Sequence, residues 1–317
     1  MDMKITQAMP IVLTLEEAAR NPGLAAMCTP VTDGTLALAM ETRVPSTVRA
    51  DSRHHPRRFS YRFPALTRAR AHSLDHPDAP ATTWTAAALY GFGTFSDGAD
   101  SCLLRPGRSR DSRSVREPTW RRLRGDVEVV ELAWEGQPTL AVSPEFALAR
   151  CVQEVLTGCR VWDVPGVPGL APPFVRAVQL VDAYRFADLP LARLPQVARG
   201  KVDARVLARV VGASDAGAES PRETILRLLL DGVPELNLES QVPVYSGNRL
   251  VTRFDLADRG RGIGFMYDGA HHGGGGQWKK DAEITLELKG LGWTVIRVVS
   301  TMLDQPERLQ SILAQSL

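Results

Sequence analysis

The sequence that decides the fold of this chain is RFDLADRGRGIGFMYDGAHH, at residues 253–272. It predicts two short apolar strands joined by a glycine-containing turn, and each strand carries a carboxylate, Asp255 or Asp268. A glycine turn and two histidines, His271 and His272, follow the second strand. Carboxylates and imidazoles held together by a hairpin suit a divalent cation, and cations in such sites promote phosphodiester hydrolysis. The stretch therefore predicts a metal site.

The residues around this stretch predict a complete α/β module. Ser220 suits a helix N-cap, Pro221 its first turn, and Glu223 can close a capping box. The predicted order from there is α-β-β-β-α-β-α, and a helix linking two strands favours a mixed sheet with helices on its faces. The predicted elements are a helix from 220, strands at 241–245, 250–256 and 263–267, a helix at 277–291, a strand at 293–299 and a helix at 303–317.

The ordered set of motifs resembles the PD-(D/E)XK, or restriction-endonuclease-like, fold. More closely, it is similar to the DUF559 endonuclease-like family, which resembles the very-short-patch repair nucleases. The resemblance implies an endonuclease that hydrolyses phosphodiester bonds in double-stranded DNA with Mg²⁺ or Mn²⁺. It covers about one hundred residues, with SPRETILRLLL at 220–230, RFDLA at 253–257, MYDGAHH at 266–272, QWKKD at 277–281 and LGWTVIRV at 291–298.

The resemblance also implies roles for single residues. Asp255 matches the metal-binding aspartate of the fold, and we expect Asp268 to serve as a second metal ligand. Glu223 matches a glutamate that reaches the metal or its water, although the capping box explains the same residue equally well. His272 matches a histidine that assists proton transfer. Contacts to the nucleic acid are expected from His271, Lys279, Lys280 and Arg297, with a solvated basic face as the alternative.

Met266 departs from the family pattern. It occupies the position of a glutamate in an EYDG sequence, and a thioether is a poor ligand for Mg²⁺ or Mn²⁺. Strand alternation places Asp268 on the same face as Met266, so Asp268 and His272 can complete a reorganised site. The four glycines 273–276 are a second departure. The alternative to an active enzyme is therefore a catalytically impaired nucleic-acid-binding regulator or antitoxin that keeps the nuclease fold.

Two arginine-rich segments lie in the first half of the chain. Residues 54–70 alternate basic and aromatic side chains with period two, which predicts a strand that either contacts phosphate or is half-buried with a solvated basic face. Residues 105–124 contain eight arginines and no lysine. They predict a loop or edge strand with a strong positive field, either on a nucleic-acid backbone or facing solvent.

Other elements of this half are a helix at 14–20, capped by Thr14, a helix at 82–91, a strand at 127–132 and a helix at 143–156. The sequences WTAAALYGF at 84–92 and SPEFALARCV at 143–152 resemble the AbiEi-type antitoxin-like proteins of actinobacteria. This resemblance implies a toxin–antitoxin or phage-defence context and a protein partner encoded nearby.

The chain of 317 residues is long enough for two or three domains. We expect an N-terminal region at 1–55, in the position of a degenerate winged helix, an α+β domain at 56–160, a linker and helical connector at 161–219, and the nuclease-like domain at 220–317. A charged content of 23% and a hydrophobic content of 44% are typical of a folded protein.

We also expect a cytoplasmic protein without a membrane segment, because the sequence shows no signal peptide and no run of eighteen apolar residues. The four cysteines form no CxxC pair, which favours free thiols in a reducing compartment. They are Cys28, Cys102, Cys151 and Cys159.

Overall fold

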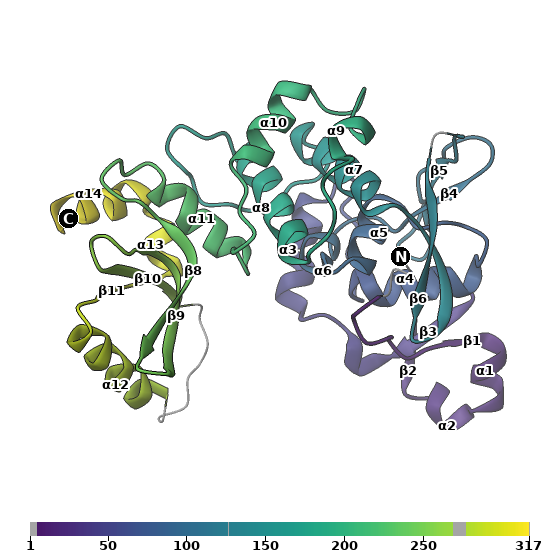
Figure 1. Ribbon diagram of the computed structural model, residues 1–317. Helices are drawn as coiled ribbons and strands as arrows, with labels where there is room; N and C mark the ends of the chain where they lie inside the picture. The colour runs from purple at the N-terminus through teal and green to yellow at the C-terminus, as the bar shows by residue number, and fades with distance from the viewer. Residues whose placement is uncertain (1–4, 126, 269–276, 317) are drawn as a thin grey trace. The chain divides into compact units, whose positions relative to one another are not determined.

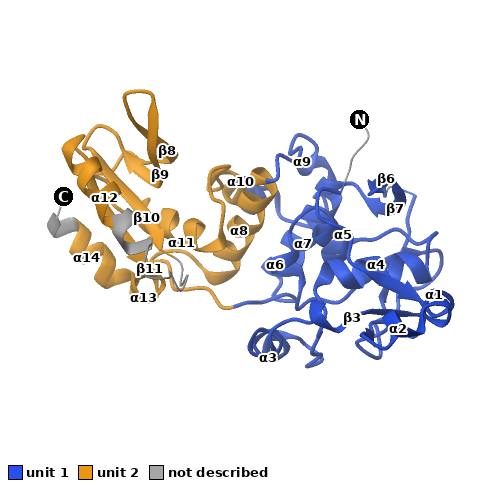
Figure 2. Cartoon of the chain, turned by 90° about the horizontal axis from the view of Figure 1, so that it is seen from below, with its two compact units in different colours: residues 1–162, 187–208 blue, residues 163–186, 209–317 orange. Residues whose placement is uncertain are grey.

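The computed structural model describes residues 5–125, 127–268 and 277–316, with the backbone alone for 277–281 and 314–316. The chain is a mixed α/β protein with several small sheets (Figure 1). It divides into two compact units (Figure 2). Unit 1 is Met1–Trp162 with Ala187–Ala208, and unit 2 is Asp163–Phe186 with Arg209–Leu317. The region expected to be one connector, 161–219, is therefore shared between both units.

Unit 1 begins with a three-stranded antiparallel sheet in the order β1-β3-β2. Thr14 caps the first helix, since its hydroxyl accepts the Glu17 N–H at 3.2 Å and the Glu17 carboxylate accepts the Thr14 N–H at 2.8 Å. The predicted capping box is confirmed. The elements are β1 (Val12–Thr14), α1 (Leu15–Arg20), α2 (Pro22–Ala25), β2 (Cys28–Pro30), β3 (Thr35–Leu38), a 3₁₀ turn η1 (Ala39–Glu41) and α3 (Pro45–His54).

The remainder of unit 1 is built on buried helices. Every residue of α5 is buried, and this helix packs against α4 and α7. Two strand pairs complete the unit, β4–β5 parallel and β6–β7 antiparallel. The helices predicted at 82–91 and 143–156 are confirmed. The elements are α4 (Ala65–Asp75), α5 (Thr83–Leu89), α6 (Gly93–Ser96), β4 (Cys102–Arg105), β5 (Thr119–Arg122), β6 (Val129–Trp134), β7 (Gln137–Val142), α7 (Pro144–Leu156) and α9 (Leu194–Val197).

The strand predicted for residues 54–70 is wrong. Helix α3 ends at His54, α4 starts at Ala65, and the residues between them are irregular. Arg68 is buried, and its guanidinium donates to the carbonyls of Ala99 and Asp97 at 2.9 and 2.7 Å. The alternation arises because buried aromatic rings anchor an irregular segment, and Arg68 serves the core rather than a phosphate.

Unit 2 contains a four-stranded mixed sheet in the order β11-β10-β9-β8. The pairs β8–β9 and β9–β10 are antiparallel, and β10–β11 is parallel. Figure 1 shows α12 on one side of this sheet and α11, α13 and α14 on the other. The elements are α8 (Pro172–Phe186), α10 (Ala204–Gly212, shared with unit 1), α11 (Pro221–Leu230), β8 (Glu239–Ser246), β9 (Arg249–Asp258), β10 (Ile263–Asp268), α12 (Gln277–Gly290), β11 (Thr294–Val299), α13 (Ser300–Leu303) and α14 (Pro306–Ser316).

The predicted order of helices and strands in this module is therefore observed, except that the last helix is broken into α13 and α14. Ser220 caps α11, and its hydroxyl accepts the Glu223 N–H at 3.3 Å. The α12 side of the sheet is held by an apolar cluster centred on Phe254, whose ring lies 5.1 Å from that of Trp293. A Cβ added at Gly264 would overlap the Phe254 ring, so that position requires glycine.

Among the described residues, no helix combines the length and apolar character needed to cross a membrane.

Candidate functional site

Asp255 lies near the end of β9 and is half-buried. Its Oδ2 accepts the backbone N–H of Tyr267, on the neighbouring strand β10, at 2.6 Å. Burial raises the pKa of Asp255, and the charges of Glu219 and Asp268 raise it further against the opposing effect of that hydrogen bond. The predicted carboxylate is thus held in one orientation by the sheet and lies in a locally negative field.

Glu223 lies in the first turn of α11, and the charges of Asp255 and Glu219 act on it as well. Its carboxylate accepts the Ser220 hydroxyl at 2.8 Å and the Glu219 N–H at 2.9 Å, so the structure shows a capping role for this side chain. Burial raises its pKa, and the nearby charge of Asp255 contributes to the increase. The sequence allowed Glu223 to be either a helix cap or a site ligand. Its hydrogen bonds are those of a cap, and its raised pKa is compatible with a ligand.

Gln241 and Glu219 border this pair and were missed by the sequence reasoning. The Gln241 amide donates to Glu223 at 3.4 Å, and its backbone is left-handed, with φ of 55°. Non-glycine residues in this conformation are strained and concentrate at functional sites. The strand register skips Gln241 and Asp255, since it passes from Ser240↔Leu256 to Val242↔Phe254. Glutamine and aspartate do not mark such a break in strand pairing, so a single sequence could not predict it.

Asp268 is engaged by a cation of the protein itself. Arg297, on the adjacent strand β11, donates through Nη1 to both carboxylate oxygens of Asp268, at 3.1 and 3.3 Å. Two residues predicted to act separately, one on the metal and one on the nucleic acid, are therefore brought together as an ion pair. Both side chains remain partly exposed, which leaves the pair open to exchange with solvent.

Met266 is half-buried and packs against the apolar cluster of Phe254 and Leu288. Its side chain is therefore part of the packing between β10 and α12. Of the other predicted residues, His271 and His272 lie outside the described residues. Lys279 and Lys280 belong to the first turn of α12.

The described carboxylates of unit 2 do not form a ready metal cluster. Within the described ranges, no group of three or more His, Cys, Asp and Glu side chains is placed as metal ligands would be. Two of these carboxylates are linked electrostatically, since the charge of Asp255 on β9 contributes to the raised pKa of Glu223 on α11. Mg²⁺ is commonly bound through one or two carboxylates together with water and substrate phosphate oxygens, so a pair is a sufficient protein contribution.

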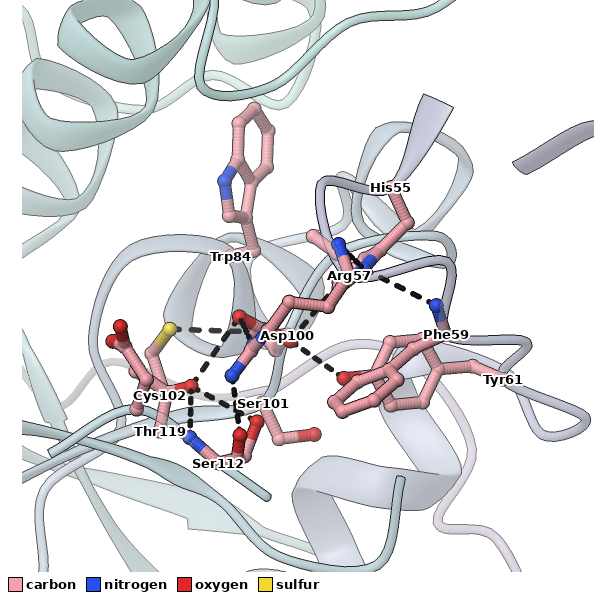
Figure 3. Close-up of polar contacts among 12 residues, drawn as sticks. His55, Arg57, Phe59, Tyr61, Trp84, Asp100, Ser101, Cys102, Ser112 and Thr119 are labelled. Atoms are coloured by element: carbon pink, nitrogen blue, oxygen red, sulfur yellow. Dashed lines mark hydrogen bonds and ion pairs between the residues drawn. The ribbon is translucent and has the colours of Figure 1, made fainter. Parts of the chain in front are cut away.

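Unit 1 contains a second polar cluster, centred on Asp100 (Figure 3). The Tyr61 hydroxyl donates to Asp100 Oδ1 at 2.6 Å, His55 Nε2 lies 3.1 Å from the same oxygen, and Arg57 forms an ion pair with Oδ2. Burial opposes ionisation, but the hydrogen bonds of His55 and Tyr61 and the charge of Arg57 outweigh it and lower the pKa of Asp100 to about 2. The cluster ties the irregular segment before α4 to strand β4.

A cavity of about 310 Å³ adjoins this cluster and is lined by Asp100, Trp84 and Glu154. The indole N–H of Trp84 donates to Glu154 at 2.7 Å, and burial raises the pKa of that carboxyl. Because these polar groups bond to one another, the cluster supports a structural role in unit 1.

Comparisons with protein-family models, with curated proteins and with solved structures found no match for this chain.

Proposed function

We propose that unit 2 is a metal-dependent DNA phosphodiester hydrolase domain of the PD-(D/E)XK kind. The order of its elements and the mixed β11-β10-β9-β8 sheet support this class. The observation that carries the proposal is the half-buried Asp255 carboxylate, which the Tyr267 N–H holds in one orientation and whose charge contributes to the raised pKa of the half-buried Glu223 on α11. Such carboxylates gain from a cation, because a bound positive charge offsets both the burial of their charged forms and the negative charges around them.

The residues present fit Mg²⁺ or Mn²⁺. Carboxylate oxygens are the ligands that hard divalent cations prefer, and Asp255 and Glu223 would hold the ion. A divalent ion in such a site polarises a phosphoryl oxygen and makes bound water more acidic. The Tyr267 N–H fixes the Asp255 carboxylate, and the Ser220 and Gln241 side chains fix that of Glu223. The protein would therefore supply two oriented carboxylates, one from the interior strand β9 and one from α11.

The decisive experiment compares three proteins on supercoiled plasmid, linear duplex and single-stranded DNA with Mn²⁺. Wild type is expected to cut, whereas Asp255→Asn is expected to fall to background. The asparagine oxygen can still accept the Tyr267 N–H, so loss of activity would report the missing charge rather than a disturbed sheet. Asp258→Asn, three residues along the same strand, is the matched control and is expected to keep activity.

A second candidate is a nucleic-acid-binding domain of the same fold that does not cut. Two observations favour it, the ion pair between Asp268 and Arg297 and the packing of Met266 against the apolar cluster. Arg297 offsets the charge of Asp268, and Met266 occupies the position where the resembling family has a glutamate. In the same experiment this candidate predicts no cleavage with Mn²⁺ and no difference between wild type and Asp255→Asn. A separate binding measurement should then show that wild type binds DNA.

A further inference from the structure

We infer that one face of unit 1 binds the phosphate backbone of duplex nucleic acid through four arginines on β4, β5 and their flanking loops. These residues, called the arginine face below, are Arg105, Arg108, Arg122 and Arg124. The inference rests on the proposed function only for the class of ligand, and it concerns a surface distinct from the carboxylates of unit 2.

The backbone gathers these arginines from both ends of the loop 106–118. Arg105 and Arg122 are directly paired in the parallel register of β4 and β5. The Leu123 N–H donates to the Arg105 carbonyl at 2.8 Å, and the Arg122 N–H donates to the Ser109 hydroxyl at 3.2 Å. Arg108, next to Ser109, is therefore brought beside Arg122 although fourteen positions separate them in sequence. The positive charges are placed by secondary structure and not by a free loop.

The register also separates two kinds of arginine. Paired residues of adjacent strands project to the same side, so Arg105 and Arg122 share a side with Trp120, and Arg121 projects to the opposite one. The Arg105 guanidinium lies over the Trp120 ring, 4.7 Å from its centroid, which holds this side chain against the sheet. On the other side, Arg121 is bonded to Asp111 at 2.7 Å.

Ion pairing draws a further distinction, between the arginine face and two other arginines of the loop. Arg110 is paired with Glu117 at 3.0 Å, and Arg116 lies 3.6 Å from Asp33. Among the residues that the structure describes, no carboxylate lies in ion-pair contact with any arginine of the arginine face. Directly opposed like charges destabilise a strand pair. Arg105 and Arg122 therefore keep a repulsion that an external anion would relieve.

The surroundings favour duplex phosphate over other anionic partners. In the described part of this loop, Val115 is the large apolar side chain that is exposed. One such side chain gives too small an apolar surface for a membrane anchor or for the core of a protein interface. Trp120 is 9% exposed beneath Arg105, so it offers no open ring for stacking on unpaired bases. Arginine forks bind phosphate oxygens in a bidentate manner. The face therefore suits backbone contacts that are independent of sequence.

The test measures binding of the full chain to a short fluorescent duplex DNA in EDTA, so that cleavage cannot contribute. Affinity is followed from about 50 to 200 mM salt. Arg108→Gln/Arg122→Gln is expected to lower the slope of log affinity against log salt by about 1.8, the loss of two phosphate contacts. The matched control, Arg110→Gln/Arg116→Gln, removes the same charge from ion-paired positions of the same loop and is expected to leave the slope nearly unchanged.

Equal effects of the two double variants would show that DNA binding depends on net charge alone and would overturn the inference. Failure of wild type to bind duplex DNA at low salt would also overturn it. Preference for single-stranded DNA, or arginine-dependent binding to anionic vesicles in place of DNA, would overturn it as well. If the first double variant unfolds, Arg108→Gln alone replaces it, with an expected decrease in slope of about 0.9. Binding in EDTA without cleavage in Mn²⁺ would thus keep this inference and remove the hydrolase.

Discussion

Asp268 and Arg297 form an ion pair across the parallel strands β10 and β11, with Nη1 of Arg297 3.1 Å from Oδ2 of Asp268. This contact sets the charge balance of the candidate site, because Asp268 is one of the charges that raise the pKa of Asp255. Arg297 therefore partly offsets the negative field to which a metal ion would respond.

Removal of the guanidinium is expected to strengthen metal binding. Arg297→Gln leaves Asp268 uncompensated beside Asp255 and should tighten Mn²⁺ binding by up to roughly fivefold, because a solvent-exposed pair contributes about 1 kcal/mol or less. The measurement is the increase in Tm across a Mn²⁺ titration. Arg297→Lys, which keeps the charge, is the control. Weaker Mn²⁺ binding by Arg297→Gln would show that Asp268 does not act on the site.

The raised pKa of Asp255 predicts how stability depends on pH. A carboxyl whose folded pKa exceeds its unfolded pKa binds its proton more tightly when folded, so ionisation at neutral pH opposes folding and acid relieves the opposition. Without metal, Asp255→Asn should therefore raise Tm at pH above the folded pKa, and the gain should vanish below an unfolded pKa of about 4. Mn²⁺ should stabilise wild type and leave the variant unchanged.

The pKa of Asp258, on the same strand, is shifted in the opposite direction from that of Asp255. The N–H groups of Asn237 and Arg261 donate to its carboxylate and lower its pKa. Its charged form is favoured by folding, so Asp258→Asn should lower Tm at neutral pH and lose that effect in acid. Shifts of the same sign in both variants would contradict the assignment.

Met266 is expected to tolerate apolar but not acidic replacement. Because it packs against the cluster of Phe254 and Leu288, Met266→Glu buries a charged group and should lower the free energy of unfolding by about 1–3 kcal/mol. Met266→Leu should change it by less than about 1.5 kcal/mol. Urea unfolding measures both. An acidic variant as stable as wild type would place the side chain in water and reopen the position to a metal ligand.

The buried pair of Asp182 and Arg227 joins α8 to α11, with Oδ2 and Nη2 2.9 Å apart. Asp182 also accepts the Thr224 hydroxyl at 2.8 Å. Asp182→Ala removes the closest carboxylate from a buried guanidinium, which retains the Ala213 carbonyl and the more distant, exposed Asp231, and should lower the free energy of unfolding by about 3–5 kcal/mol. The comparison is Glu287→Gln, which breaks the exposed pair with Arg249 and should have little effect. Similar losses of unfolding free energy in Asp182→Ala and Glu287→Gln would show that the buried pair stabilises the fold no more than the exposed pair does.

Acid stability of unit 1 should depend on Asp100. Its folded pKa of about 2 lies below the ordinary value, so its contribution is present above pH of about 4 and is lost as the pH falls through about 2. Asp100→Asn should lower stability at neutral pH by about 2 kcal/mol, and the difference from wild type should shrink across this window. Tyr61→Phe, which removes one donor, should show a smaller loss. Parallel pH profiles for wild type and Asp100→Asn would contradict this account.

The sequence predicted the elements of unit 2 well because their signals are local. Ser220 and Pro221 mark the start of α11, and strand alternation marks β9 and β10. The mixed sheet with helices on its faces followed from the same order of elements, and Asp255 and Glu223 lie on the predicted strand and helix. The partners did not, because the contact of Arg297 with Asp268 depends on the parallel register of two strands separated by a helix.

The failure at residues 54–70 has a related cause. Period two is a pattern of strands, but Tyr61 and Phe63 are buried from an irregular segment and Arg68 from a helix. Buried arginine is uncommon, and the carbonyl groups that bind Arg68 lie about thirty positions further along the chain, where sequence periodicity gives no information.

The three passages of the chain between the two units constrain how a gene for this protein can be rearranged. A fragment beginning at residue 220 would encode the whole β11-β10-β9-β8 sheet yet omit α8, which supplies Asp182. Such a fragment would lack the closest ion-pair partner of the buried Arg227 and would keep the more distant contact with Asp231, at 3.6 Å. A single recombination breakpoint therefore cannot transfer unit 2 intact, and we expect the two units to be inherited together, as one block rather than as exchangeable modules.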